Sequence, residues 1–594
     1  MSSPSNPASD LDSDSDSDSS HSQPVPSQFY LPLNVVFYLC LLSNTLAASL
    51  SPIQDCDEVF NYWEPTHYLT HGSGFQTWEY SPDYSIRSWL YISIHTVIAK
   101  TLGLLARTKS AQFYMVRLAL GLVCTICETR AFAAVSRSLN PRVGLIFLLI
   151  LVFSPGMFHA STALLPSSFA MYTSMLGLAS FLEWKGGSKL ARGILWFGIG
   201  GMVGWPFSAA LMVPFVLEDV VVSWSLGNMR PVILMVLKGV ANCLKVLCGV
   251  VLVDSLFYRK LVFVPWNIIA YNVFGGAGKG PNIFGTEPPT FYFKNLLLNF
   301  NLWSLLALAG GPLLVLQALF RPHKSSRQTL LRSITLVLPF YSWLAIFTLQ
   351  PHKEERFMYP AYPFLALNAA IGFHIILAYI GSSSPGSLIG HIPVKFKMMA
   401  VSICVLVAIN IGILRIAGVV TAYSAPLQIF DGLQYGDGPM PEGFVCYGKE
   451  WYRFPSSFFL PNDNLRAKFI KSEFEGLLPG EFAESRKELG PYPGTWMTPK
   501  GMNDLNQEDP DKYIPISRCD YLVDSYFPGD SETDLEPHYI LDSDSWEKLS
   551  CKPFLDNRRT GFLGRVLWVP SLPFVPKKYQ REWGQYCLLK RRYL

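Results

Sequence analysis

The sequence is poor in charge. Asp, Glu, Lys and Arg make up 15% of its 594 residues, whereas apolar residues make up 50%. Soluble domains carry about 25% charged residues, so this balance favours a membrane protein over a chain of soluble domains. The formal net charge is only +4. The chain therefore lacks the strong basic field of a nucleic-acid-binding protein, and we expect no nucleic-acid partner.

Three familiar motifs are also missing. The first 28 residues are polar, with an Asp/Ser run at 10–20, and contain no signal peptide. We expect residues 1–28 to form a disordered acidic tail on the cytosolic side of the membrane. No Asn-x-Ser/Thr sequon marks a lumenal segment. The glycine run at 275–280 fails the P-loop pattern because Gly280 follows Lys279 where Ser or Thr is required, which excludes nucleotide binding at that run.

Apolar stretches recur through residues 29–420, and residues 421–594 contain none of comparable length. A helix of about 20 apolar residues crosses a hydrocarbon core of about 30 Å. The pattern predicts about eleven crossings, two of them short at 143–156 and 191–205. The predicted spans are 29–50, 112–135, 143–156, 167–184, 191–205, 207–224, 231–256, 299–320, 329–350, 358–380 and 398–420.

Lys and Arg gather in alternate loops, which predicts that these loops are cytosolic. The loops 51–111, 157–166, 257–298 and 351–357 and the tail 421–594 then face the lumen, with the N-terminus cytosolic. Within the first of these loops, residues 86–106 are apolar but interrupted by charge, so we expect a helix in the membrane interface. The cytosolic cations are Arg137, Arg142, Lys185, Lys189, Arg192, Arg230, Arg321, Lys324, Arg327, Lys395 and Lys397.

Residues 421–594 are rich in Pro, Gly and aromatic side chains and contain short alternating stretches, which predict a compact α+β lumenal domain. Five cysteines lie outside the predicted spans, and disulfides are expected among them if that side is oxidising, with the pairing left open. Cys124 and Cys127 form a C-x-x-C inside an apolar run, which favours packing over redox chemistry. The five cysteines are Cys56, Cys446, Cys519, Cys551 and Cys587.

The first candidate site is the segment 55–67, directly after the first predicted span. It places Asp55, Asp57 and Glu58 within four residues. Neighbouring carboxylates repel one another, so one of them is expected to hold a raised pKa suited to accepting a proton. A solvated loop of ordinary acids is the alternative interpretation.

The second candidate site is the segment 351–357, between two apolar stretches. His352, Lys353 and Arg356 supply the donors that a phosphate requires. Anchors that snorkel to the interface would explain one cation rather than the whole group. Polar and aromatic residues at other span ends suit a site for an isoprenoid chain and a sugar, or else a plain aromatic belt; these are Ser167, Trp205, Tyr271 and Asn272.

These segments resemble the glycosyltransferase family 22 mannosyltransferases, which have the GT-C fold and use dolichyl-phosphate mannose. The resemblance runs through the segments 55–67, 74–82, 86–88, 165–168, 204–207, 271–272 and 352–357 and resumes in the tail at 448–457. Within that family, the tail and the stretch 61–67 are most similar to the α-1,2-mannosyltransferases of N-glycan precursor assembly. The acidic N-terminal tail is not part of the family pattern.

The resemblance implies an all-α polytopic GT-C membrane protein of the endoplasmic reticulum, with residues 29–420 as the transmembrane catalytic domain. The donor would be dolichyl-phosphate mannose and the acceptor a dolichyl-diphosphate oligosaccharide, which receives its seventh and ninth mannoses. The donor, the acceptor and the enzyme are then all expected to lie in a lipid membrane. A sibling enzyme of GPI-anchor synthesis is the alternative. A transporter or scramblase would need polar groups at mid-membrane between repeats, and we find neither in the sequence.

An inverting transfer from a β-linked donor needs one base. Asp57 is assigned that role by the resemblance, with Glu58 and Asp55 as alternatives. His352, Lys353 and Arg356 are expected to stabilise the departing phosphate in place of a metal, so we predict no metal and no cofactor. The predicted substrate-binding residues are Asp55, Asn61, Trp63, Glu64, His67, Trp78, Glu79, Tyr80, Arg87, Ser167, Trp205, Tyr271, Asn272 and Glu355.

Overall fold

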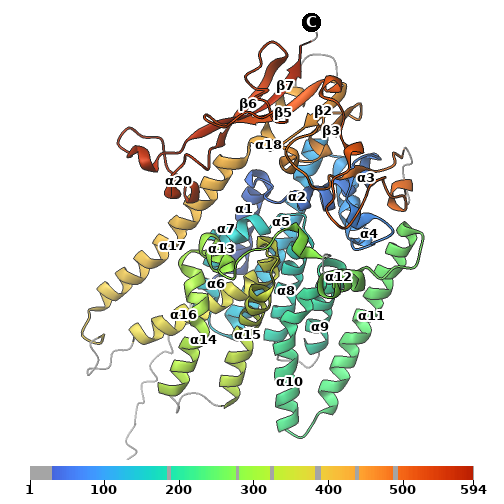
Figure 1. The fold of residues 1–594 in the computed structure, drawn as a ribbon. Coiled ribbons are helices and arrows are strands. Elements are labelled where there is room, and N and C mark those ends of the chain that lie inside the picture. The colour runs from blue at the N-terminus through green and yellow to red at the C-terminus, as the bar shows by residue number, and fades with distance from the viewer. Residues whose placement is uncertain are drawn as a thin grey trace, which may run out of the picture.

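The computed structural model describes residues 30–183, 189–275, 280–320, 327–381, 389–434, 441–485 and 492–592. The predicted acidic tail 1–28 and Lys279 of the glycine run lie outside this description. A bundle of helices occupies one half of the molecule, and a mixed sheet with its loops covers one end of the bundle (Figure 1).

Within the described residues, eight helical segments are long and apolar enough to cross a membrane, which confirms a polytopic helical protein. These segments are α1 (Leu33–Leu50), α5 (Lys109–Ser138), Pro206–Ser225 with α10 (Val213–Ser225), α11 (Arg230–Tyr258), α14 (Leu302–Phe320), α15 (Arg327–Leu349), Glu355–Ile380 with α16 (Tyr362–Ile380), and α17 (Val394–Tyr423).

The other three predicted spans are also helical but shorter. They correspond to α6 (Pro141–Phe153), α8 (Pro166–Leu182) and α9 (Lys189–Ile199), which continues as a π-helical turn to Gly204. A helix rises about 1.5 Å per residue, so α6 alone does not cover a core of about 30 Å. The number of eleven crossings therefore remains a prediction.

The segments predicted to be lumenal lie at one end of the bundle. In Figure 1 the short helices α2 (Cys56–Glu58), α3 (Glu64–His71), α7 (Pro155–Ala160), α12 (Val264–Phe274) and α13 (Phe291–Phe300) lie towards the same end as the sheet, whereas the turn between α10 and α11 lies at the opposite end. This arrangement agrees with the alternation of the predicted loops.

The apolar stretch 86–106 forms α4 (Trp89–Gly103), a helix of 15 residues that is too short to count as a span. Its first turn is capped from another helix. The buried Asp254 of α11 accepts hydrogen bonds from Ser88 Oγ and from the Leu90 backbone N–H, both at 3.0 Å. A helix start leaves backbone donors unpaired, so this contact accounts for an acidic residue in an apolar helix.

The C-terminal region contains a five-stranded sheet in the order β3-β2-β5-β7-β6. Strands β3 (Leu465–Phe469), β2 (Gly443–Tyr447) and β5 (Tyr521–Tyr526) run parallel, and β7 (Trp583–Arg591) pairs antiparallel with β5 and with β6 (Trp546–Leu555). Three short helices accompany it: α18 (Ala425–Gln428), α19 (Asp431–Gln434) and α20 (Phe562–Val566).

The two faces of this sheet belong to different hydrophobic clusters. Val445 and Tyr447 of β2 join the large core of the molecule, whereas Cys446 between them joins a small cluster on the other face. This is the period of two that a pleated strand imposes. Two disulfides, Cys446–Cys519 and Cys551–Cys587, confirm the expectation of disulfides in the tail and settle its pairing, while Cys56 is free.

The C-terminal region does not have its own main core. Strand β4 (Gly480–Glu481) pairs antiparallel with β1 (Phe75–Gln76) of the first loop. Phe60 and Phe75 of that loop lie in the same core as Phe454 and Phe469, with ring centroids of Phe75 and Phe469 4.8 Å apart. Residues on the two sides of the predicted boundary at 420 therefore share one hydrophobic core.

Candidate active site

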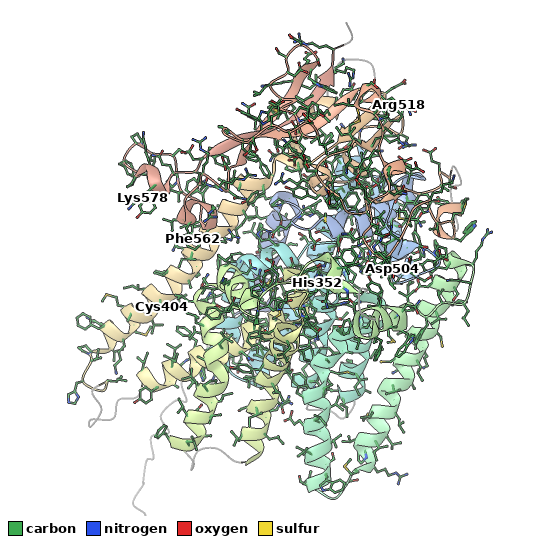
Figure 2. The ribbon with its side chains drawn as sticks, in the orientation of Figure 1. His352, Cys404, Asp504, Arg518, Phe562 and Lys578 are labelled. Carbon is green, nitrogen blue, oxygen red and sulfur yellow. A yellow bond between two sulfur atoms is a disulfide. The ribbon has the colours of Figure 1, made fainter. Side chains whose placement is uncertain are left out.

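A cavity of about 650 Å³ lies between the helix bundle and the C-terminal region. Its lining comes from four parts of the chain: the first loop, the ends of the spans with the segment 352–357, the segment 264–284, and the C-terminal region. His352 marks its place in the middle of the molecule (Figure 2). The predicted site residues that line it are Asp55, Asp57, Asn61, Trp78, Glu79, Arg87, Ser167, Trp205, Tyr271, Asn272, His352 and Arg356.

Asp55 and Asp57 are positioned by an irregular helical turn. Asp55 caps α2, its Oδ1 accepting the Asp57 backbone N–H at 2.9 Å. The chain then continues as a π-helical turn at Val59–Trp63 before α3 begins. Such π turns are rare and occur often at functional sites. The turn makes Asp55 a support for the backbone and leaves the Asp57 side chain facing the cavity, 38% exposed.

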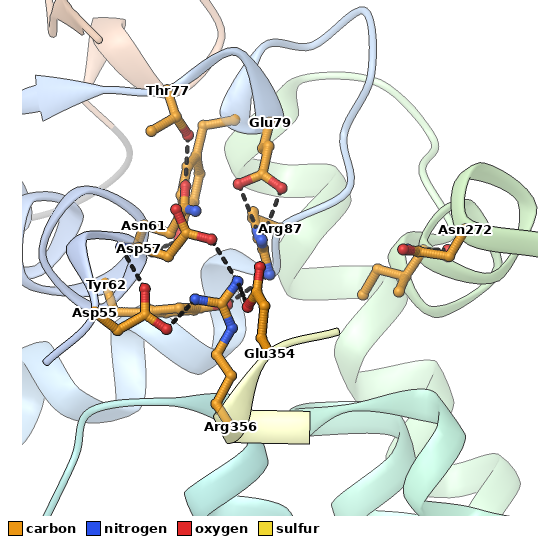
Figure 3. Close-up of polar contacts among 12 residues, drawn as sticks. Asp55, Asp57, Asn61, Tyr62, Thr77, Glu79, Arg87, Asn272, Glu354 and Arg356 are labelled. Atoms are coloured by element: carbon orange, nitrogen blue, oxygen red, sulfur yellow. Dashed lines mark hydrogen bonds and ion pairs between the residues drawn. The ribbon is translucent and has the colours of Figure 1, made fainter. Parts of the chain in front are cut away.

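One guanidinium joins the first loop to the segment 352–357. Arg356 Nη1 binds Asp55 Oδ2, and Arg356 Nη2 binds Asp57 Oδ2 at 2.5 Å and also Glu354 Oε2 (Figure 3). Charge-assisted contacts of this kind are the strong class of hydrogen bond. Asp57 Oδ1 accepts no hydrogen bond from the part of the chain that the structure describes. That oxygen is available to a ligand.

The two aspartates titrate differently. Burial raises the pKa of Asp55 to about 7, with the neighbouring Asp57 and Glu354 carboxylates adding to the shift against Arg356. Burial also acts to raise the pKa of Asp57, but the Arg356 and Arg87 guanidiniums outweigh it and hold that pKa below its ordinary value. Asp57 is therefore ionised at neutral pH, as a base must be.

The predicted phosphate-binding residue His352 has a polar partner at each of its two ring nitrogens. His352 Nδ1 donates to the Gly285 carbonyl at 2.7 Å, and Nε2 lies 2.9 Å from Glu354 Oε1. Burial acts to lower the pKa of His352, but these two acceptors outweigh it and raise the pKa above its ordinary value. The imidazolium form is thereby favoured.

Lys353 is not brought into the cavity. Its ammonium is buried and donates to the backbone carbonyls of Glu287 at 2.8 Å and of Gln350 and Pro351. Three carbonyls satisfy the three donors of an ammonium. The side chain therefore stabilises the backbone of this segment and does not point at a substrate phosphate.

A second ion pair lies beside Asp57. Arg87 binds Glu79 through two parallel contacts of 3.0 and 2.7 Å, and its Nη1 donates to the Tyr62 hydroxyl at 2.6 Å (Figure 3). A forked pair of this geometry fixes both side chains. Arg87 therefore offers a fixed positive charge at the cavity wall and little freedom to move.

Aromatic rings surround the rest of the cavity. The Trp78 ring lies 5.2 Å from Tyr271 and 6.3 Å from Phe284, and it is stacked on the latter. Trp205 packs 5.2 Å from Phe357. Ser167, in the first turn of α8, is 5% exposed, and its hydroxyl has no hydrogen-bond partner among the described residues. Asn272 donates its amide back to the Ile268 carbonyl of its own helix.

Six further predicted residues lie outside the cavity lining, in addition to Lys353: Glu58, Trp63, Glu64, His67, Tyr80 and Glu355. Glu58 is 5% exposed and accepts hydrogen bonds from Trp63 Nε1 and from the Leu164 backbone N–H, both at 3.0 Å. It ties the first loop to the start of α8 and does not face a substrate. Glu355 accepts from Asn295 Nδ2 at 2.7 Å.

The other outlying residues join the first loop to its surroundings. Tyr80 donates its hydroxyl to the Asn61 carbonyl at 2.6 Å, and His67 Nδ1 donates to the Ser73 carbonyl at 2.6 Å. Glu64 is fully buried and accepts from Ser456 Oγ, the Ser457 backbone N–H, Ser457 Oγ and the Phe75 backbone N–H at 2.7–2.9 Å. These residues hold the loop, and through Glu64 the tail, in place.

Several lining residues were not singled out in the sequence as site residues. Tyr62, Thr77 and Glu354 lie inside motifs that the sequence analysis quoted, so closer attention to those motifs would have included them. The lining residues between 474 and 506 lie in loops with no span end to mark them. Only the tertiary structure brings these loops to the cavity.

Two groups of metal-type donors occur in the part of the chain that the structure describes, and protein cations lie against both. The ligand atoms of Asp55, Cys56 and Asp57 lie within 4.8 Å of one another, but the Arg356 guanidinium already binds the two carboxylates.

The second group is His67, His71 and Asp463, again within 4.8 Å. The Lys109 ammonium lies 3.1 Å from Asp463 Oδ1 and 3.3 Å from His67 Nε2. Each group thus has a compensating positive charge of its own. The predicted absence of a metal cofactor stays a prediction.

Comparison with known proteins identifies relatives that match almost the whole chain. The chain is 41% identical over 566 residues to the α-1,2-mannosyltransferase alg9 of Schizosaccharomyces pombe, covering 94% of each chain. It is 39% identical over 576 residues to the α-1,2-mannosyltransferase ALG9 of Homo sapiens, covering 95% of this chain and 90% of the relative. Among solved structures, ArnT from Cupriavidus metallidurans bound to undecaprenyl phosphate matches with a TM-score of 0.47 and 13% identity over 74% of this chain and 85% of that one.

The sequence profile of the Alg9-like mannosyltransferase family matches residues 35–461. This match and the relatives confirm the predicted enzyme class, a glycosyltransferase of the α-1,2-mannosyltransferase type. The chain belongs to the Alg9-like mannosyltransferase family.

Proposed function

We propose that this enzyme transfers mannose, with inversion, from dolichyl-phosphate mannose to the dolichyl-diphosphate-linked oligosaccharide on the lumenal side of the endoplasmic reticulum membrane. It would add the seventh and ninth mannoses through α-1,2 bonds. The observation that carries the proposal is Asp57, a carboxylate held by Arg356 through one oxygen, with the other oxygen open to a cavity at the ends of apolar helices.

Asp57 Oδ1 would accept the proton of the acceptor's 2-hydroxyl while that oxygen attacks the anomeric carbon of the donor. The bond from the anomeric carbon to the phosphate oxygen breaks as the new glycosidic bond forms, and dolichyl phosphate leaves. One base suffices because the phosphate leaves without a proton. Because the acceptor is held by the enzyme, the reaction is effectively unimolecular, which lowers the barrier.

The leaving phosphate gains negative charge, so cations near it stabilise the transition state more than the ground state. Arg356, Arg87 and His352 are the cationic side chains in the described lining of the cavity. Each is bound to a carboxylate. A phosphate that enters beside Glu354 would compete with that carboxylate for Arg356. We therefore propose that Arg356 and His352 bind the donor phosphate and that Lys353 does not.

The direct test uses purified protein, synthetic dolichyl-phosphate mannose and defined lipid-linked acceptors. We expect transfer to the oligosaccharide acceptor and a product that an α-1,2-specific mannosidase removes. The alternative is the family branch that acts in GPI-anchor synthesis, since the chain is 24% identical over 57% of its length to the GPI mannosyltransferase 3 of Candida albicans. Transfer to a glycosylphosphatidylinositol precursor instead of the oligosaccharide would favour that alternative.

The lumenal placement has its own test. The alternation of Lys and Arg loops predicts a cytosolic N-terminus and a lumenal tail. Protease treatment of intact microsomes should remove an N-terminal tag and leave a C-terminal tag intact. The reverse pattern would place the cavity in the cytosol and contradict the proposed donor side.

A further inference from the structure

The C-terminal region supplies an uncharged part of the described cavity lining, as the segment 264–284 also does, whereas the charged lining residues lie elsewhere. The C-terminal part is made of Trp451, Phe474, Leu477, Pro479, Met502 and Asn506 with their neighbours, and among the described residues of this region none that lines the cavity is charged. Every charged residue in the described lining belongs to the first loop or to the segment 352–356. We call these six residues the C-terminal wall.

The C-terminal wall is aromatic and partly open. The rings of Trp451 and Phe474 lie 4.5 Å apart at an angle of 40°, and Trp451 is stacked on Phe60 of the first loop at 6.2 Å. The side chains of Trp451 and Phe474 are both half-buried. Half-covered aromatic faces suit the C–H face of a pyranose ring, which is apolar and weakly positive.

Asn506 supplies a polar group that is held in place. Its Oδ1 accepts the Leu477 backbone N–H at 3.0 Å, and its backbone has a φ of 54°, a left-handed value that asparagine tolerates better than most residues. Among the described residues its Nδ2 donates to no group. A fixed amide N–H that lines the same cavity as two aromatic rings is a typical set of groups for a neutral hydroxylated ligand.

The wall is anchored to the segment that carries Asp57. Trp451 lies just before Ser456 and Ser457, which Glu64 binds with both carboxylate oxygens, and Glu64 lies one helical turn and a π turn after Asp57. Strands β1 and β4 add a second connection, with Leu478 and Pro479 directly before β4. These contacts therefore hold the C-terminal wall at a fixed position relative to Asp57, the proposed base.

The two substrates differ in where their charge lies. In dolichyl-phosphate mannose the reacting carbon is bonded to the phosphate, so its site requires cations close to the ends of the spans. In the acceptor, the reacting mannose is separated from the diphosphate by a chain of neutral sugars. A neutral aromatic wall fits the second substrate and not the first.

We propose that the C-terminal wall is the acceptor subsite, where Trp451 and Phe474 stack on neutral mannose residues and Asn506 donates to a sugar hydroxyl. This inference rests on the proposed function and specifies which part of the chain selects the acceptor. The tail is then a part of the active site that sets specificity, and not an accessory domain.

The test measures KM for each substrate with the purified full-length chain, the dolichyl-diphosphate oligosaccharide acceptor and dolichyl-phosphate mannose. Trp451→Ala and Asn506→Ala should each raise the acceptor KM by about tenfold, which corresponds to 1.4 kcal/mol, while the donor KM changes by less than about twofold. Trp568→Ala is the matched control, since that indole is 39% exposed and lies outside the cavity. It should leave both constants unchanged.

Trp451→Phe keeps a ring that packs on Phe474, so it should fold if Trp451→Ala does not, and it should show a smaller rise in acceptor KM. An acceptor KM within about twofold of wild type for Trp451→Phe and Asn506→Ala, or an equal rise in donor KM, overturns the acceptor subsite while leaving the proposed function intact. If wild-type protein transfers no mannose to this acceptor, the proposed function itself fails, and the subsite with it.

Discussion

The two halves of the segment 55–67 are both rich in polar residues, but their acidic side chains have different roles. Asp57 in the first half is 38% exposed to the cavity and has one charged partner, Arg356. Glu64 in the second half is fully buried and accepts four hydrogen bonds, three of them from the tail. A dense polar motif therefore combines a reactive group with the joint that holds it. Exposure and unfilled hydrogen-bonding capacity separate the two roles.

The largest expected effect is on the first half. Asp57→Asn keeps the shape of the side chain and removes the base, so kcat should fall by about 10²–10⁴ with little change in thermal stability. Measured kcat with both substrates saturating tests this. Asp55→Asn is the matched control and should retain more activity, because Asp55 supports the backbone. A variant at Asp57 that keeps more than about a tenth of kcat would transfer the role of base to a neighbouring acid.

Glu64→Ala should instead remove the hydrogen bonds that hold the second half in place. It leaves four buried donors without an acceptor, and each such loss costs about 1–3 kcal/mol, so we expect the free energy of unfolding to fall by at least about 3 kcal/mol. Thermal unfolding in detergent measures it. Glu475→Ala removes an exposed carboxylate and should stay within about 0.5 kcal/mol of wild type. A stable Glu64→Ala variant with no activity would instead place Glu64 in catalysis.

Arg356→Lys tests the contact between the first half and the segment 352–357. An ammonium cannot fork between Asp55, Asp57 and Glu354 as a guanidinium does, and hydrogen bonds to charged groups contribute about 1.5–3 kcal/mol, so kcat/KM for the donor should fall by about 10- to 100-fold. Arg558→Lys, at a pair with an 82% exposed guanidinium, is the control. Wild-type kcat/KM in Arg356→Lys would make Arg356 a structural anchor.

The pH dependence sharpens the choice between the two aspartates. The base must be deprotonated, so activity is present above its pKa and lost as pH falls through it. The pKa of Asp57 lies below its ordinary value of about 3.9, and that of Asp55 is raised to about 7. We therefore expect kcat/KM to stay constant from pH 7 down to about pH 4, close to that ordinary value. A decline centred near pH 7 would assign the base to Asp55.

The smallest expected effect concerns Lys353. Its ammonium binds backbone carbonyls outside the cavity, so Lys353→Met should lower thermal stability while the donor KM changes by less than about threefold. The measurement pairs thermal unfolding with donor titration. A tenfold rise in donor KM with unchanged stability would restore Lys353 as a phosphate ligand.

Much of the architecture followed from local pattern. Spans are long apolar runs, and hydropathy needs no tertiary information to find them, which is why the helices of the bundle appear where they were predicted. The stretch 86–106 was correctly predicted to be helical, and its place in the membrane interface stays a prediction. The lengths of α6 and α9 remained ambiguous, since neighbours and tilt decide how a short helix meets the bilayer.

The site was predicted less completely, for a physical reason. Motif residues such as Asp57, Arg87 and Arg356 do converge on one cavity, although 299 residues separate the last from the first. Sequence could not tell Asp57 from Glu58, because the difference is the direction that each side chain takes from an irregular turn. Nor could it find Phe474 or Asn506, which have no local pattern and become lining residues only by packing.

The sequence by itself determined the membrane class, the enzyme family and the set of charged residues from which the site is built, since hydropathy and motif chemistry are local properties. The tertiary structure alone decided that Arg356 binds Asp55 and Asp57, that Lys353 turns away, that Cys446 pairs with Cys519 and Cys551 with Cys587, and that the tail closes the cavity. These are contacts between distant segments, and they depend on how the chain packs, which no local pattern encodes.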